Sequence, residues 1–124
     1  MKSNRPVNLK LSSLHFPPMA IASILHRISG IVLFLGLPFV LYLWQQSLAS
    51  ETTFIQVQNM FNCDVVKTGM WGLGAALIYH AMAGIRHVLS DIGWGDQLPL
   101  ARWTAYGTMG LSVVLVLILG IIIW

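Results

Sequence analysis

The sequence has few charged residues: only 9% of its 124 residues are Asp, Glu, Lys or Arg, whereas 56% are hydrophobic. Soluble domains carry about a quarter charged residues, so this composition excludes an ordinary soluble domain and predicts a membrane protein. The net charge of +3 is small, and the charged residues are dispersed along the chain. Because nucleic-acid binding needs a concentrated basic surface, we expect no nucleic-acid partner.

Cysteine is nearly absent, since Cys63 is the only one. A single cysteine cannot form an internal disulfide, and an iron–sulfur cluster requires several cysteines. The sequence also lacks a P-loop and a GxGxxG motif, the usual signs of nucleotide binding. We therefore expect no catalytic residue in this chain. The polar start MKSNRPVNLKLSSLH lacks the short apolar core that a cleavable signal peptide needs.

Three long apolar segments are present instead. They predict transmembrane helices at about residues 19–48, 65–91 and 103–124, within a single transmembrane domain of residues 1–124. About 20 residues suffice to cross a hydrocarbon core about 30 Å thick, and each segment reaches that length. The connectors, 49–64 and 92–102, are polar or contain Gly and Pro. The expected fold is an all-α membrane protein with three transmembrane helices, part of a multi-subunit helical bundle.

Positive charges predict how these helices are oriented. Lysine and arginine are concentrated in the N-terminal tail, at Lys2, Arg5 and Lys10, and are absent from the connector 49–64. Because positively charged loops stay in the cytoplasm, we expect a cytoplasmic N-terminus and an external C-terminus. Without a signal or transit peptide pattern, a bacterial-type inner membrane is the expected location.

Ionisable side chains interrupt the first apolar segment, although such groups are costly in lipid. In the stretch SILHRISG, residues at helical spacing share one predicted face: Ser23, His26, Arg27 and Gly30. Arg27 could extend its side chain to lipid headgroups. Alternatively, Ser23, His26 and Arg27 form a polar pocket near the cytoplasmic surface, together with His87. Such a pocket suits an anionic or carbonyl-bearing group, for example a haem propionate or a quinone oxygen.

The second segment carries two histidines on a face of small residues. This seam consists of Gly69, Gly72, Ala76, His80, Ala83 and His87. At 1.5 Å per residue, His80 lies roughly 16 Å from Asp91 and His87 roughly 6 Å, which places His80 near the bilayer middle. The seam could serve helix packing alone, or leave room for a flat macrocycle beside His80. Neutral imidazole is a common haem-iron ligand, and one ligand here implies a second from a partner chain.

Two motifs resemble a known family. Arg5-Pro6-Val7 followed by SILHRISG, and YHAMAGIRH (residues 79–87) closing with Asp91, resemble the signatures of the cytochrome b anchor subunits of succinate dehydrogenase. The resemblance extends over the whole chain. It implies a subunit of respiratory complex II, which passes electrons from succinate oxidation to ubiquinone in the respiratory chain and citric acid cycle. The implied partners are a second membrane-anchor subunit, an iron–sulfur subunit and a flavoprotein subunit.

The resemblance also implies roles for individual residues. The position of His80 ligates haem b, which is shared with the second anchor subunit. The positions of Ser23 and Arg27 contact ubiquinone. His26 and Arg27 match residues near the haem propionates, and His87 is expected to join them. Two alternatives stay open: a haem-free anchor of the fumarate reductase type, and a structural membrane subunit that uses its small-residue seam only for assembly.

Overall fold

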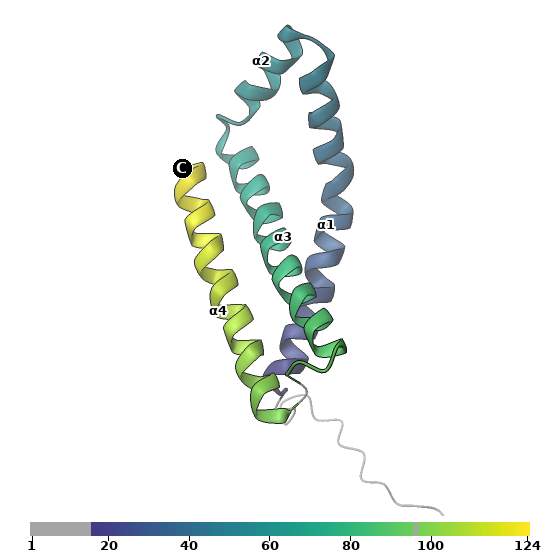
Figure 1. The fold of residues 1–124 in the computed structure, drawn as a ribbon. Helices are drawn as coiled ribbons and strands as arrows, with labels where there is room; N and C mark the ends of the chain where they lie inside the picture. The colour runs from purple at the N-terminus through teal and green to yellow at the C-terminus, as the bar shows by residue number, and fades with distance from the viewer. Residues whose placement is uncertain (1–15, 96) are drawn as a thin grey trace, which may run out of the picture.

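A computed structural model describes residues 16–95 and 97–124, which form four helices and no strand (Figure 1). The helices are α1 (Pro18–Ala49), α2 (Glu51–Met60), α3 (Asp64–Asp91) and α4 (Leu98–Ile123). The all-helical prediction is therefore confirmed for these residues. The charges used to predict orientation, and the motif Arg5-Pro6-Val7, lie outside the described residues.

Helix α1 begins at a pair of prolines. Pro17 is the N-cap residue in an extended conformation, and Pro18 occupies the first turn. Proline suits this position because the first amide groups of a helix have no intrahelical acceptor. From there α1 continues for 32 residues, about 48 Å at 1.5 Å per residue. The helix is thus longer than the thickness of a bilayer core.

The first connector contains a helix that the sequence did not predict. α2 is 10 residues long and begins after a capping box. The Ser50 hydroxyl oxygen accepts a hydrogen bond from the Thr53 amide at 3.1 Å, and the Thr53 hydroxyl oxygen accepts one from the Ser50 amide at 3.0 Å. These reciprocal bonds satisfy two backbone donors at the helix start. In Figure 1, α2 connects α1 and α3 at the end of the bundle away from the start of α1.

Helix α4 begins at Leu98 rather than at the predicted Trp103. The early start is possible because Pro99 lies in the first turn, where proline is well tolerated. The chain reverses between α3 and α4 through Gly93 and Gly95, which have φ values of 86° and 90°. Glycine adopts such positive φ values without steric cost.

Helix α3 packs against both α1 and α4 (Figure 1). Near the α2 end, the indole nitrogen of Trp71 donates a hydrogen bond to the Val116 carbonyl of α4 at 3.0 Å. The predicted small-residue seam is only partly used within this chain. A Cβ added at Gly69 or Gly72 would meet no atom within 4 Å, so this end of the seam faces outward, whereas Ala83 is buried.

The exterior of the bundle is apolar, and its few buried positions include hydroxyl groups. Phe34 and Ile121 are 76% and 79% exposed, whereas Ser29 and Ser112 are 6% and 3% exposed. Apolar surface of this extent matches lipid better than water. α1 and α4 are each long and apolar enough to cross a membrane. α3, predicted as a third crossing helix, is not one of these two helices; its residues include Lys67, His80, Arg86 and His87.

Candidate functional site

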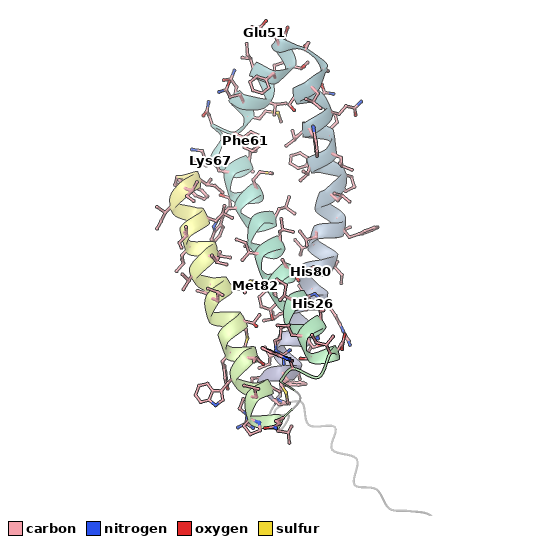
Figure 2. The ribbon with its side chains drawn as sticks, viewed as in Figure 1. His26, Glu51, Phe61, Lys67, His80 and Met82 are labelled. Atoms are coloured by element: carbon pink, nitrogen blue, oxygen red, sulfur yellow. The ribbon has the colours of Figure 1, made fainter. Side chains whose placement is uncertain are left out.

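Three histidines form a cluster where α1 packs against α3. Figure 2 labels two of them, His26 and His80. The ring of His26, from α1, stacks on the ring of His80, from α3, with centroids 4.2 Å apart and an interplanar angle of 23°. The His87 ring lies on the other flank of His26, with centroids 5.1 Å apart and an angle of 43°. His26 thus lies between two imidazoles of α3, and we call His26, His80 and His87 the histidine cluster.

The His80 ring is held by hydrogen bonds at one nitrogen only. Its Nδ1 lies 3.1 Å from the Ser29 hydroxyl oxygen and 3.2 Å from the His26 carbonyl oxygen, both on α1. The same Ser29 hydroxyl donates to the His26 carbonyl at 2.7 Å. Among the residues that the structure describes, no hydrogen-bond partner reaches the other ring nitrogen, Nε2. One ring nitrogen is therefore fixed by α1, and the other has no hydrogen-bond partner among the described residues.

One glycine allows the His80 ring to lie so close to the backbone of α1. A Cβ added at Gly30 would lie 3.1 Å from Cε1 of His80, which is tighter than an ordinary contact. A Cβ at Gly84 would lie 3.8 Å from Nε2 of His26, which is an ordinary van der Waals contact. That Nε2 is buried and has no hydrogen-bond partner in the described chain. Because an unpaired buried polar atom is costly, this nitrogen is a candidate for a hydrogen bond with a group from outside the described chain.

Two further residues of the site were not given a role from the sequence. Ser29 holds His80, as described above, and the Tyr79 hydroxyl donates to the Ala22 carbonyl at 3.0 Å. Both lie inside the quoted motifs, next to residues that were singled out. A serine three residues after His26 shares its helical turn, and this spacing is the signal that could have identified Ser29.

Among the described residues, no hydrogen bond joins the side chain of Ser23 or Arg27 to the histidine cluster. Ser23 is half-buried and Arg27 is exposed, and neither forms a side-chain hydrogen bond with another described residue. The expected single face is therefore divided: His26 and Gly30 contact α3, whereas Arg27 is exposed. The predicted four-residue pocket is only partly formed within this chain, because only His26 and His87 meet.

Three cavities lie elsewhere in the bundle. One of about 500 Å³ lies among α1, α2 and α3, one of about 460 Å³ lies between α1 and α3, and one of about 560 Å³ lies between α3 and α4. The last is lined by Arg86, which donates hydrogen bonds to the Thr104 hydroxyl at 3.4 Å and to the Ala101 carbonyl at 3.3 Å. Neither Ser23, Arg27 nor any member of the histidine cluster lines these cavities.

The fold and the site define a helical membrane protein with histidines gathered between two of its helices. A family model described as "Succinate dehydrogenase/Fumarate reductase transmembrane subunit" matches residues 1–119. The succinate dehydrogenase cytochrome b556 subunit of Coxiella burnetii is 41% identical over 125 residues, covering 100% of both chains. The subunit of the same name from Paracoccus denitrificans is 30% identical over 118 residues, covering 92% of this chain and 88% of its own.

The chain therefore belongs to the family of succinate dehydrogenase/fumarate reductase transmembrane subunits. This confirms the resemblance found in the two sequence motifs. The chain is a non-catalytic anchor subunit of an oxidoreductase complex, in agreement with the lack of catalytic motifs in its sequence.

Proposed function

We propose that this chain is the cytochrome b anchor of a succinate:ubiquinone oxidoreductase, binding haem b and forming part of the ubiquinone-reduction site. The observation that carries the proposal is the state of His80, whose Nδ1 is held by α1 while Nε2 has no partner in the described chain. The names of the relatives, which are cytochrome b556 subunits, support the same function. A second anchor subunit would supply the other haem ligand, and iron–sulfur and flavoprotein subunits would complete the complex.

The proposed arrangement is a single domain in which α1, α3 and α4 cross a bacterial-type inner membrane, with the N-terminus in the cytoplasm. α3 has 28 residues, about 42 Å at 1.5 Å per residue, so its length is sufficient. Polar residues are tolerated in a membrane helix when they face other helices or a bound group, as His80 and His87 do. The histidine cluster then lies in the cytoplasmic half of the bundle, because α1 begins and α3 ends on that side.

The residues present fit haem b, which supplies a one-electron redox centre when it is bound. His80 would bind the iron through Nε2, the nitrogen that α1 leaves free. His26 would offer its unpaired buried Nε2 to a propionate, and His87 lies beside it to extend the same polar surface. Arg27, the next residue of α1, would add a positive charge for the other haem propionate.

The proposed quinone contacts are Ser23 and Arg27, one helical turn apart on α1. A serine hydroxyl can donate a hydrogen bond to a quinone carbonyl. The guanidinium of Arg27 stays charged even when it is partly buried, so it can stabilise the negative charge that develops as electrons reach the quinone. Both side chains are free of hydrogen bonds within the described chain. Partner subunits would therefore form the remaining walls of this pocket.

Replacing His80 tests the haem proposal. In the intact complex, His80→Ala should abolish the bis-histidine absorption spectrum of reduced haem b. His15→Ala is the matched control, since it removes the one histidine outside the histidine cluster and should leave the spectrum unchanged. A wild-type spectrum from the His80→Ala complex would refute the assignment.

The spectrum of the wild-type complex separates this proposal from a haem-free anchor of the fumarate reductase type. Sharp bands of low-spin haem b on reduction support the cytochrome function. Their absence from a complex that still contains all its subunits would favour the haem-free alternative.

The quinone proposal is tested by comparing two activities on the same membranes. Ser23→Ala and Arg27→Leu should leave succinate oxidation by a soluble artificial acceptor largely intact and strongly lower electron transfer to ubiquinone. Ser47→Ala and Arg102→Leu are matched controls, because Ser47 lies near the far end of α1 and Arg102 lies on α4. If the ratio of the two activities keeps its wild-type value in the Ser23 and Arg27 variants, these residues are not the quinone site.

A further inference from the structure

The hydroxyl of Ser29 lies between the α1 backbone and the imidazole of His80. We propose that Ser29 is a positioning residue, which holds His80 in the tautomer protonated at Nδ1 and so directs the lone pair of Nε2 toward haem iron. The proposal deepens the haem function described above and rests on it. Ser29 itself would touch neither the haem nor the quinone.

The tautomer follows from counting protons around the His26 carbonyl. This oxygen can only accept hydrogen bonds, and it lies 3.2 Å from His80 Nδ1 and 2.7 Å from the Ser29 hydroxyl. If Nδ1 carried a lone pair, two acceptors would face each other at 3.2 Å. With a proton on Nδ1, the contact becomes favourable. A neutral imidazole protonated at Nδ1 has its lone pair on Nε2, the form that binds a metal.

Ser29 is the main acceptor for that proton. Ser29 has a single hydroxyl proton, and its shorter contact, 2.7 Å to the His26 carbonyl, is a hydrogen bond only if that proton lies there. Toward His80 the oxygen of Ser29 then acts as an acceptor. The His26 carbonyl is a poorer partner for Nδ1, because it already accepts from Ser29 and from the helix amide of Gly30. Ser29 is only 6% exposed, so water cannot easily replace its hydroxyl.

A hydrogen bond of this kind affects a metal-binding histidine in two ways. It fixes the orientation of the ring, and it makes the imidazole more basic by drawing on the Nδ1 proton. A more basic ligand stabilises ferric over ferrous iron, which lowers the reduction potential of the haem. Such outer partners commonly change metal affinity about 10–100-fold when they are removed. We expect the lower end for Ser29, because the His26 carbonyl remains as a second acceptor.

A purely structural role for Ser29 makes a different prediction. Serine in a membrane helix often bonds the carbonyl one turn earlier, with no further role. Ser112 on α4 is such a case: its hydroxyl donates to the Thr108 carbonyl at 2.7 Å, and it is 3% exposed. Ser112 contacts no histidine by hydrogen bond, so Ser112→Ala is a closely matched control for the loss of a buried hydroxyl.

The test uses the intact complex and three measurements: haem retained after washing, the midpoint potential of the haem, and the low-temperature EPR spectrum of the ferric haem. Ser29→Ala should keep a bis-histidine haem but bind it about 10-fold more weakly. Its potential should rise, and its EPR spectrum should shift as the ring orientation loosens. Ser29→Thr retains the hydroxyl and should restore all three properties. Ser112→Ala should match the wild type.

The outcomes separate the two proposals. If His80→Ala loses the bis-histidine spectrum while Ser29→Ala matches the wild type in potential and EPR, Ser29 has no positioning role and the haem function stands. If Ser29→Thr fails to restore the potential, the hydroxyl is not the cause and the inference is overturned. Should Ser29→Ala reduce assembly, Ser29→Cys provides the same test, because it keeps a similar size and replaces the oxygen by a weak acceptor; a wild-type potential in Ser29→Cys would refute the role.

Discussion

The close approach of His80 to the α1 backbone makes Gly30→Ala a sharp test of the packing between α1 and α3. The added methyl group would lie 3.1 Å from Cε1 and 3.6 Å from Nδ1 of the His80 ring. The ring would have to move by a few tenths of an ångström. It has little freedom to do so, because Ser29 holds Nδ1 on one side and the ring of His26 stacks against its face.

The expected effect is the sum of two opposing contributions. Overpacking a well-filled site costs about 1–3 kcal/mol. Replacing a glycine inside a helix by alanine stabilises it by about 0.5–1 kcal/mol. At the middle of both ranges, Gly30→Ala loses about 1 kcal/mol. Gly72→Ala and Gly110→Ala, where an added Cβ meets no atom within 4 Å, should show only the gain. The variants should therefore differ by about 2 kcal/mol.

Denaturant titration of the purified complex, followed by tryptophan fluorescence, measures these differences as shifts of the midpoint at constant slope. The haem spectrum provides an independent reading, since a displaced His80 should change it in Gly30→Ala alone. The double variant Gly30→Ala/His80→Ala removes the group that the methyl meets. The two changes should then show a coupling energy of about 1–3 kcal/mol, within the range for residues in contact.

Equal stability of Gly30→Ala and Gly110→Ala, with an unchanged haem spectrum, would refute the reasoning, because the methyl group would then have found free space. Additive effects of Gly30→Ala and His80→Ala would do the same. The two control glycines lie on different helices, so that a partner subunit covering one of them does not affect the other. Only a stabilisation found in both control variants is attributed to the helix itself.

Three further predictions concern the remaining interactions. Arg27→Lys should retain more ubiquinone reduction than Arg27→Leu, as measured by the ratio of quinone to artificial-acceptor activity, since lysine keeps the charge but not the fork of donors. Trp71→Phe should destabilise the complex by about 0.5–1.5 kcal/mol in denaturant titration, because it removes the bond to the Val116 carbonyl. Reporter fusions at both ends should place the N-terminus in the cytoplasm and the C-terminus outside; an external N-terminus would contradict the proposed depth of the histidine cluster.

The long helices could be predicted from the sequence because each coincides with a long apolar run. The ends were less certain where polar residues continue a helix beyond such a run. Pro99 and Arg102 were assigned to the connector 92–102. Proline is nevertheless compatible with the first turn of a helix, and α4 begins at Leu98. α2 was missed because its 10 residues are only weakly apolar. Ser50 and Thr53 were its signal, although the usual capping box has Glu or Gln at the second position.

The sequence predicted which residues belong to the candidate site better than it predicted which of them touch. Helical spacing grouped His80 with His87 on one face of α3. It placed His26 at the depth of His87 and not of His80, whereas the structure stacks the rings of His26 and His80. Spacing could not show how α1 is rotated against α3. That rotation depends on which small residues allow the closest approach, and here Gly30 meets His80 while Arg27 remains exposed. For the same reason the contact between Ser29 and His80 could not be derived from the sequence.

The rotation of α1 would also allow one short motif to serve both of the proposed ligands. In SILHRISG, one side of the helix carries His26, Ser29 and Gly30, which contact α3 around the candidate haem ligand. Arg27 is exposed, and Ser23 lies one turn from that contact, so both are open to a second group. In the proposed complex, one turn of α1 would separate the haem from the quinone. A change at Ser29 or Gly30 should then affect the haem first, whereas a change at Ser23 or Arg27 should affect the quinone first.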